Sequence, residues 1–114
     1  MPPNLPENWI TQLRKGVLEL CMLNALRGGP KYGYDIVRCL GSIEGLVVRE
    51  GTVYPILSRL KREGLLRTEI VESAEGPPRK YYSLTRLGKS LLAGMNTYWN
   101  KLTDGIATLM ENQA

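Results

Sequence analysis

The chain has 114 residues, and its 15 Lys and Arg against 11 Asp and Glu give a net charge of +4. This length is that of one compact domain, and a mild basic excess suits a polyanionic partner. The absence of histidine removes the commonest general base and metal ligand, and no common catalytic motif is present. We therefore expect neither an enzyme nor a bound cofactor.

No run of residues approaches the roughly eighteen apolar positions that span a bilayer, and the N-terminus lacks the features of a secretion signal. These observations predict a cytoplasmic protein without membrane contact. Cys21 and Cys39 stand alone inside helical patterns. We expect them to be buried, reduced thiols, because such isolated cysteines seldom form a disulfide or a metal site.

Residues 1–8 contain three prolines and predict an extended arm. The first helix should begin near residues 7–9 and continue to about Arg27. Residues 17–26 are apolar nearly all round, so neighbouring elements should cover more than one face of this helix. The Gly-Gly-Pro sequence at 28–30 should end it.

A short second helix is expected from Tyr34 to Leu40, and a turn joins it to a third within residues 49–64, as in a helix-turn-helix. Pro55 requires the third helix to begin one to four residues earlier, because its missing N–H is harmless only in the first turn. Gly64 should serve as its C-cap. The buried face of this helix should consist of Val53, Ile56, Leu57 and Leu60.

The opposite face of the third helix carries hydroxyls, one aromatic ring and two guanidinium groups. This inventory suits a DNA groove, although a solvated polar surface is the usual fate of such residues. The residues on this face are Thr52, Tyr54, Pro55, Ser58, Arg59 and Arg62.

After Gly64 the apolar period changes from 3.6 to 2 over residues 66–71, as in a half-buried strand. Residues 80–84 predict a second strand, and residues 73–78 have the composition of a hairpin loop. Arg79 and Lys80 lie where this loop rejoins the strand. A hairpin with a basic tip after a helix-turn-helix predicts a winged helix, so the expected fold class is mainly α with a small β-hairpin (α+β).

Thr85 should cap a last helix of about 28 residues, roughly 42 Å long. One apolar stripe runs along it and extends beyond anything that residues 1–84 can cover, so a second copy of the chain should cover it. This predicts an arm at 1–8, a winged helix at 9–84 and a dimerisation helix at 85–114. The stripe consists of Leu87, Leu91, Met95, Tyr98, Leu102, Ile106 and Leu109.

Several segments, in this order and spacing, resemble the PadR-like transcriptional regulators over residues 13 to about 110. The single C-terminal helix resembles the small subgroup of that family. The resemblance implies a dimeric repressor that binds a palindromic operator in double-stranded DNA and releases it when a small molecule binds. The matching segments are 13–20, 32–36, 51–57 with 59–60 and 63–65, and 79–85 with Gly88.

Phosphate contacts are expected from tyrosines and from the hairpin. The phenols of Tyr32 and Tyr54 suit phosphate contact while their rings pack, although both residues would equally fit the edge of a core. Arg79 and Lys80 would contact the backbone of DNA, unless they only flank a solvated turn.

The resemblance also places Trp99 where drug sensors of the small subgroup bind flat aromatic compounds. Met95 lies one turn before it, and Leu13, Gly16 and Leu20 form a stripe of matching spacing on the first helix. These residues would line an effector cavity at the dimer centre, or Trp99 would simply pack in the dimer interface.

Two other functions remain as alternatives. A winged helix can bind protein instead of DNA, against which the cations Arg59, Arg62, Arg79 and Lys80 argue. An enzyme is the second alternative, and no constellation of catalytic residues supports it.

Overall fold

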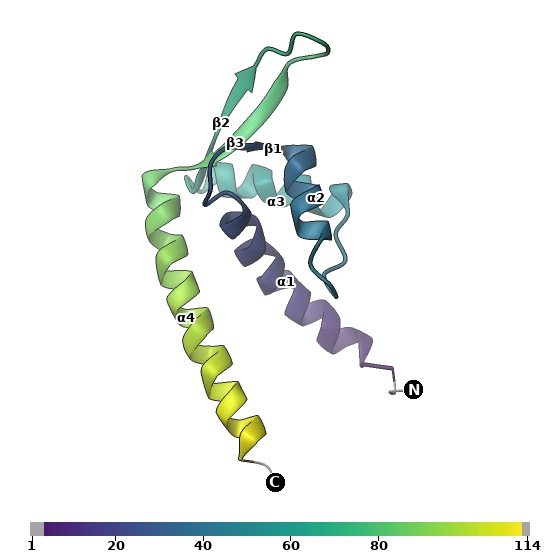
Figure 1. Ribbon diagram of the computed structural model, residues 1–114, viewed down its shortest axis with the longest axis vertical. Coiled ribbons are helices and arrows are strands. Elements are labelled where there is room, and N and C mark those ends of the chain that lie inside the picture. The colour runs from purple at the N-terminus through teal and green to yellow at the C-terminus, as the bar shows by residue number, and fades with distance from the viewer. Residues whose placement is uncertain (1–3, 113–114) are drawn as a thin grey trace.

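The computed structural model describes residues 4–112, which form four helices and three strands. Their arrangement confirms the predicted α+β class, a winged helix-turn-helix followed by one long helix (Figure 1). The helices are α1 (Glu7–Ala25), α2 (Gly33–Gly41), α3 (Glu50–Arg62) and α4 (Arg86–Glu111), and the strands are β1 (Lys31–Tyr32), β2 (Leu66–Val71) and β3 (Arg79–Leu84).

The core lies where α1, α2 and α3 meet the base of the sheet. As predicted, α1 is covered on more than one face, because it lies between α2 and α4 (Figure 1). The last turn of α1 supplies two of the fully buried side chains. The largest fully buried side chains are Met22, Leu23, Ile36, Leu40, Val53, Leu57 and Leu60.

The predicted hairpin is formed by β2 and β3, which pair from Leu66 with Leu84 to Val71 with Arg79. The predicted alternation holds only at its base. Leu66 is buried there, whereas Ile70 is 65% exposed. The hairpin projects from the helices, so nothing covers its outer half (Figure 1).

The short strand β1 was not expected from the sequence. It pairs with β3, with Lys31 opposite Tyr82 and Tyr32 opposite Tyr81, which gives an antiparallel sheet of order β1-β3-β2. A strand of two residues is too short to show a periodic pattern. It is recognised as a strand only by its pairing with β3. This pairing brings the start of α2 against the hairpin.

Thr85 caps α4, as predicted. Its hydroxyl accepts a hydrogen bond from the N–H of Gly88 at 3.0 Å and donates to the carbonyl oxygen of Gly64 at 2.6 Å. One side chain therefore closes the first turn of α4 and joins that turn to the end of α3.

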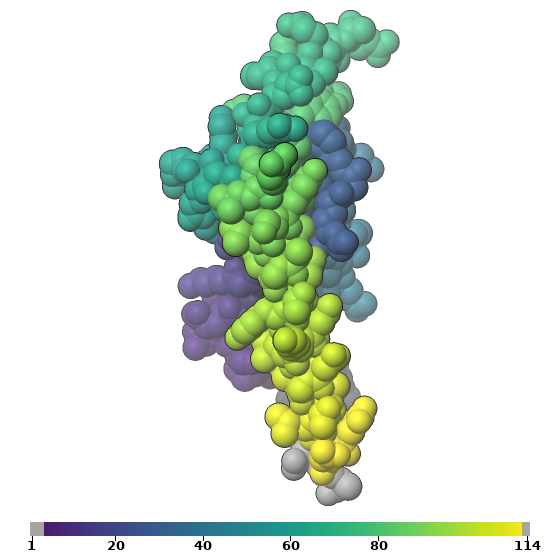
Figure 2. Space-filling view, turned by 90° about the vertical axis from the view of Figure 1, so that its left-hand side faces the viewer, coloured from purple at the N-terminus to yellow at the C-terminus, as the bar shows by residue number. Residues whose placement is uncertain are grey.

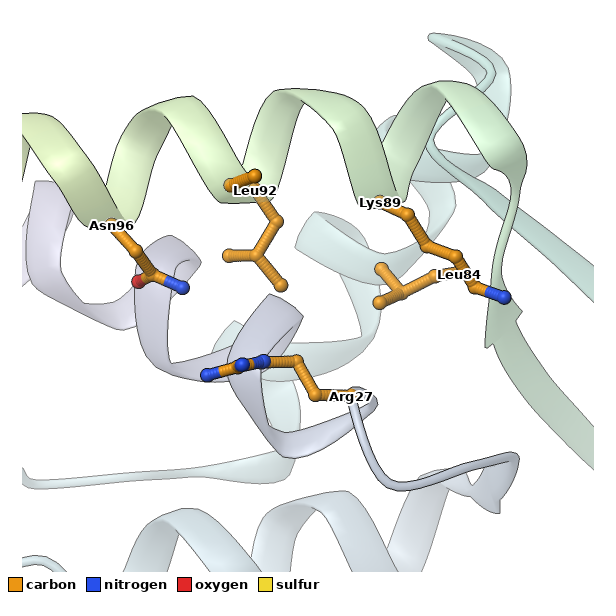
Figure 3. Close-up of a pocket in the computed structure, with 6 residues that line it drawn as sticks. Arg27, Leu84, Lys89, Leu92 and Asn96 are labelled. Atoms are coloured by element: carbon orange, nitrogen blue, oxygen red, sulfur yellow. The ribbon is translucent and has the colours of Figure 1, made fainter.

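Two asparagines join α4 to α1. The side-chain amides of Asn24 and Asn96 donate to each other's oxygen atoms, both at 2.9 Å. Leu92 of α4 and Arg27, which follows α1, line a hollow of about 380 Å³. Figure 3 shows Leu92 pointing toward Arg27. Leu92 is buried, so this contact combines apolar packing with the amide pair.

Beyond Asn96 the helix α4 still lines a space shared with α1 at Trp99 and Leu102, and only its last turns project alone in Figure 2. Its buried residues are Gly88 and Leu92, both in the first half. Within residues 4–112, no helix has the combination of length and apolar character needed to cross a bilayer.

The two cysteines differ from the expectation of buried thiols. Cys21 is partly buried, and Cys39, near the end of α2, is exposed. Burial raises the pKa of the Cys21 thiol, and the nearby Cys39 raises it further. Both line a hollow of about 390 Å³ together with Trp99.

Candidate nucleic-acid interface

Helix α3 has one buried and one exposed face. Val53, Leu57 and Leu60 have no exposed surface, and they hold the helix on the core. Their spacing of four and three residues leaves the opposite face in solvent. Of the predicted groove-facing residues, the exposed ones are Thr52, Tyr54, Pro55, Ser58 and Arg62.

The end of α3 confirms Gly64 as the residue that terminates it. Gly64 has a φ of 84°, a conformation that favours glycine. The N–H of Leu65 donates to the carbonyl oxygen of Leu60 at 3.0 Å, and that of Gly64 donates to Lys61 at 3.1 Å. This pair of bonds is a Schellman motif, and it turns the chain directly into the hairpin.

Pro55 lies deeper in α3 than predicted. The helix begins at Glu50, five residues before Pro55, and not within four. Pro55 has no N–H to donate to the carbonyl of Gly51, one turn earlier. Gly51 is exposed and has no side chain, so water can reach that carbonyl and the helix continues through the proline.

Arg59 lies on the polar face of α3 but is less exposed than the other polar residues there. Its Nη2 donates to Glu19 of α1 at 3.0 Å, and its Nη1 donates to Glu63 at 2.9 Å. The hydrogen bond and the charge of Glu19 are the main reasons that the pKa of Arg59 lies above its already high ordinary value. The guanidinium, predicted to be free, is instead paired with two carboxylates. The sequence did not predict the pair with Glu19, because only the fold brings α1 beside α3.

Tyrosines gather where α2, α3 and β3 meet. The ring of Tyr54 lies against Gly33, where a Cβ atom would be 2.5 Å from its Cε1 atom. A larger side chain at position 33 would therefore displace the ring of Tyr54. The ring of Tyr32 packs against Tyr81 at 5.7 Å between centroids. Burial raises the pKa of Tyr82, and Tyr54 raises it further, so Tyr82 keeps its proton at neutral pH.

Tyr32, Tyr54 and Tyr82 line a hollow of about 310 Å³, here called the tyrosine hollow. The guanidinium carbon of Arg79 lies 4.6 Å from the centroid of the Tyr32 ring, within the range of a cation–π contact. The contact holds Arg79 over the start of α2. The hollow is lined by Tyr32, Gly33, Tyr34, Tyr54, Arg79, Lys80 and Tyr82.

A second hollow of about 350 Å³, the basic hollow, lies between the exposed face of α3 and the hairpin. It shares Lys80 and Tyr82 with the tyrosine hollow, so the two adjoin. No residue that lines either hollow is acidic. The basic hollow is lined by Ser58, Lys61, Arg62, Thr68, Lys80 and Tyr82.

A third space, the tryptophan cavity, lies between α1 and α4 of the same chain and has a volume of about 360 Å³. Its wall is mostly apolar. The five residues predicted to surround an effector, which include Trp99, all lie in its lining. The cavity is lined by Gln12, Leu13, Gly16, Val17, Leu20, Met95, Tyr98, Trp99 and Leu102.

Comparison with known proteins decides the family. The sequence model of the transcriptional regulator PadR-like family matches residues 22–94, which is more than half of the chain. The chain belongs to the PadR-like family. Its members are transcriptional regulators, so this PadR-like chain is a transcriptional regulator and not an enzyme.

Solved structures agree with this assignment. A PadR-like transcription factor from Bacteroides fragilis is 44% identical, with 90% of this chain and 99% of that one covered and a TM-score of 0.74. A PadR-like regulator from Bacillus cereus is 32% identical, with 90% and 99% covered and a TM-score of 0.82. PadR of Bacillus subtilis, solved in complex with operator DNA, is 30% identical, with 69% and 45% covered and a TM-score of 0.63.

In this PadR-like chain the fold brings together most of the predicted groove residues. Tyr32, Tyr54, Arg79 and Lys80 meet in the tyrosine hollow, and Ser58, Arg62 and Lys80 meet in the basic hollow. Thr52 and Pro55 are exposed on α3 but line neither hollow.

Sequence reasoning missed several lining residues of this PadR-like surface. Lys61 stands three residues after Ser58, and that helical spacing was a usable signal for it. Thr68 follows Leu66 in the strand alternation. Tyr34 and Tyr82 had no such signal, because β1 and its pairing bring them to the hollow.

The apolar stripe of α4 is largely exposed in the single PadR-like chain. Tyr98 is 72% exposed and Leu109 is 62% exposed, and Met110 adds a further exposed apolar side chain. Met95 is the partly buried exception, because it packs against the core. The other exposed members of the stripe are Leu87, Leu91, Leu102 and Ile106.

Proposed function

We propose that this PadR-like regulator is a dimeric repressor that binds a palindromic operator and is released from it by a small aromatic compound. The observation that carries the DNA-binding part is the pair of adjoining hollows between α3 and the hairpin. Cations and phenols line them and no carboxylate does, and this composition suits a run of phosphates. The complex of Bacillus subtilis PadR with operator DNA supports the same partner.

In this proposal the exposed face of α3 enters the major groove. We infer that Thr52, Ser58 and Arg62, which are exposed, meet base edges, and that Pro55 adds apolar contact. Tyr32, Tyr54, Arg79 and Lys80 hold the flanking phosphates. Lys61 joins them, because it lines the basic hollow.

The helix α4 serves as the dimerisation element, and residues 9–84 serve as the DNA-binding unit. A monomer that exposes a stripe from Leu87 to Leu109 would present a large apolar patch to water. A second copy of the same stripe covers it with two-fold symmetry. The interface then contains Leu91, Met95, Tyr98, Leu102, Ile106 and Leu109.

The tryptophan cavity is the proposed effector site. Its lining is apolar and includes the indole of Trp99 and the phenol of Tyr98, which suit a flat aromatic ligand. Both walls belong to one chain, so a ligand there pushes α4 relative to α1. In a dimer that movement changes the distance between the two α3 helices, on which operator affinity depends.

The test is selection from a pool of random duplexes by the purified protein. We expect an inverted repeat with half-site centres about 10 bp apart, because two α3 helices related by a dyad meet successive major grooves. The operator should be preferred about a thousandfold or more over a scrambled duplex, and affinity should fall steeply with salt. Recovery of no preferred sequence, or binding that ignores salt, contradicts DNA binding and favours a protein-binding module.

A further inference from the structure

Arg59 occupies a position in α3 from which a long cation would be expected to reach DNA. Its guanidinium instead lies between two carboxylates, at 3.0 Å from Glu19 and 2.9 Å from Glu63. The side chain is 39% exposed, and that of Glu19 is 28% exposed. Each terminal nitrogen therefore donates to a carboxylate within the protein.

The two carboxylates differ in which elements they link to Arg59. Glu63 follows the last residue of α3, one turn after Arg59, so this pair stays within one helix end. Glu19 lies on α1, forty residues earlier in the sequence. Among residues 4–112, the bond from Arg59 to Glu19 is the one hydrogen bond between α1 and α3.

A second hydrogen bond joins α1 to the chain just before α3. The Nε atom of Arg14, also on α1, donates to the carbonyl oxygen of Gly45 in the connector before α3 at 3.3 Å. The helix α1 is thus bonded at two points. Arg14 contacts the connector before α3, and Glu19 contacts the last turns of α3. Between these two points lie Thr52, Pro55 and Ser58, which face the proposed groove, and Arg62 follows less than one turn after Arg59.

We propose that Arg59 is a positioning residue that sets the orientation of α3 on α1, and that it does not contact DNA. This inference rests on the proposed DNA-binding function. Base readout depends on placing side chains to within a fraction of an ångström, so a fixed helix angle matters to every contact that α3 makes. Release of Arg59 toward DNA would leave Glu19 and Glu63 unpaired beside the phosphates, which repel them.

The first experiment compares Arg59→Ala with Glu19→Ala. We expect both variants to lower the preference for operator over scrambled duplex by the same factor, about threefold for each half-site and so about tenfold for the dimer. This estimate is modest because partly exposed ion pairs contribute little. The slope of log affinity against log salt should not change in Arg59→Ala, because no phosphate contact is lost.

A DNA-contacting Arg59 gives the opposite result. Removal of Glu19 then frees the guanidinium, so Glu19→Ala keeps or raises the operator preference. Arg59→Ala then flattens the salt slope by about one ion per protomer if it meets a phosphate, or relaxes preference at one base position if it meets a base. Any of these outcomes overturns the proposal.

The second experiment restores the link with reversed charges. Glu63→Gln is the matched control, because it removes the pair within α3 but leaves the bond to α1, and it should change operator preference less than twofold. In that background, Glu19→Arg with Arg59→Glu keeps the α1–α3 pair and the net charge. We expect it to recover the operator preference to within about threefold of the control.

A swapped variant that discriminates no better than Arg59→Ala, while circular dichroism shows it folded, overturns the positioning role. If a substitution prevents folding, Arg59→Lys is the second test. It keeps one bond to Glu19 and should retain more preference than Arg59→Ala. Absence of operator preference in the unaltered protein contradicts the proposed function itself, so the two failures are distinguishable.

Discussion

Gly88 lies so close to Leu65 that a Cβ atom on it would be 2.1 Å from the carbonyl oxygen of Leu65. The first turn of α4 therefore lies directly against the backbone between α3 and the hairpin. The hydroxyl of Thr85 also bonds to that backbone, at the carbonyl oxygens of Gly64 and Leu65. This contact sets the direction in which α4 leaves the DNA-binding unit.

Gly88→Ala should destabilise the protein, because the backbone oxygen of Leu65 cannot move without shifting the hairpin. Overpacking of this kind costs about 1–3 kcal/mol, which lowers the melting temperature by roughly 5 °C or more. Thermal unfolding measures it. Gly41→Ala is the matched control, since nothing lies within 4 Å of a Cβ there and stability should be unchanged or slightly higher. Equal melting temperatures for the two variants contradict the close contact.

The proposed dimer should dissociate when charge is placed in the α4 stripe. Leu102→Glu together with Ile106→Glu puts like charges at a two-fold contact and should give monomers that bind operator weakly. Sedimentation velocity measures the change. Asn100→Glu with Ala107→Glu adds the same charge to the opposite face of α4 and should remain dimeric. An unaltered chain that sediments as a folded monomer would falsify this arrangement.

Arg79→Ala should weaken binding to all duplexes alike and flatten the salt slope, because one phosphate contact per protomer is lost. Arg62→Ala should in addition relax preference at one base position, if Arg62 meets a base edge. Fluorescence anisotropy at several salt concentrations separates these effects. Lys101→Ala removes a cation from α4 and is the control, with an unchanged slope. Identical slopes for Arg79→Ala and the unaltered protein exclude Arg79 from the contact.

Planar aromatic compounds should quench Trp99 and weaken operator binding together, because the tryptophan cavity links α1 to α4. Trp9→Tyr leaves Trp99 as the single indole of the chain and should keep both responses. Trp99→Ala should lose both and still form a dimer that binds DNA. Dissociation of the Trp99→Ala dimer would instead make Trp99 a packing residue, and quenching confined to Trp9 would place the ligand elsewhere.

Stability should fall at alkaline pH through Tyr82. Burial raises its pKa above the ordinary value of 10.0, so the folded state holds the phenol proton more tightly than the unfolded state does. This contribution is fully present below about pH 10 and is lost as the pH rises through the higher pKa of the folded state. Urea unfolding between pH 8 and pH 11 should show a smaller decline in Tyr82→Phe, with Tyr81→Phe as the control. An equal decline in both variants contradicts this assignment.

The winged-helix fold was predictable because its elements carry local, repeating patterns. A period of 3.6 marks α3 and α4, a period of 2 marks the base of the hairpin, and Gly64 and Thr85 cap their helices by short-range bonds. The same patterns showed which face of each helix needed cover. They predicted most residues of the proposed DNA-binding surface, since a surface opposite a buried stripe is exposed by geometry, whereas the place of Trp99 in the proposed effector site came from the resemblance to the PadR-like family.

The partners of individual side chains depended on the tertiary structure. Arg59 lies on the polar face of α3, yet the sequence carries no sign that Glu19 would come within 3.0 Å of it. In the same way β1 exists only because β3 lies beside it, and Gly88 is required only because α4 crosses Leu65. The apolar periodicity of a helix or strand shows which of its faces must be buried, because that stripe can be recognised within one segment of the sequence. Packing between distant segments decides which charge is paired, because that depends on distances which the chain alone does not specify.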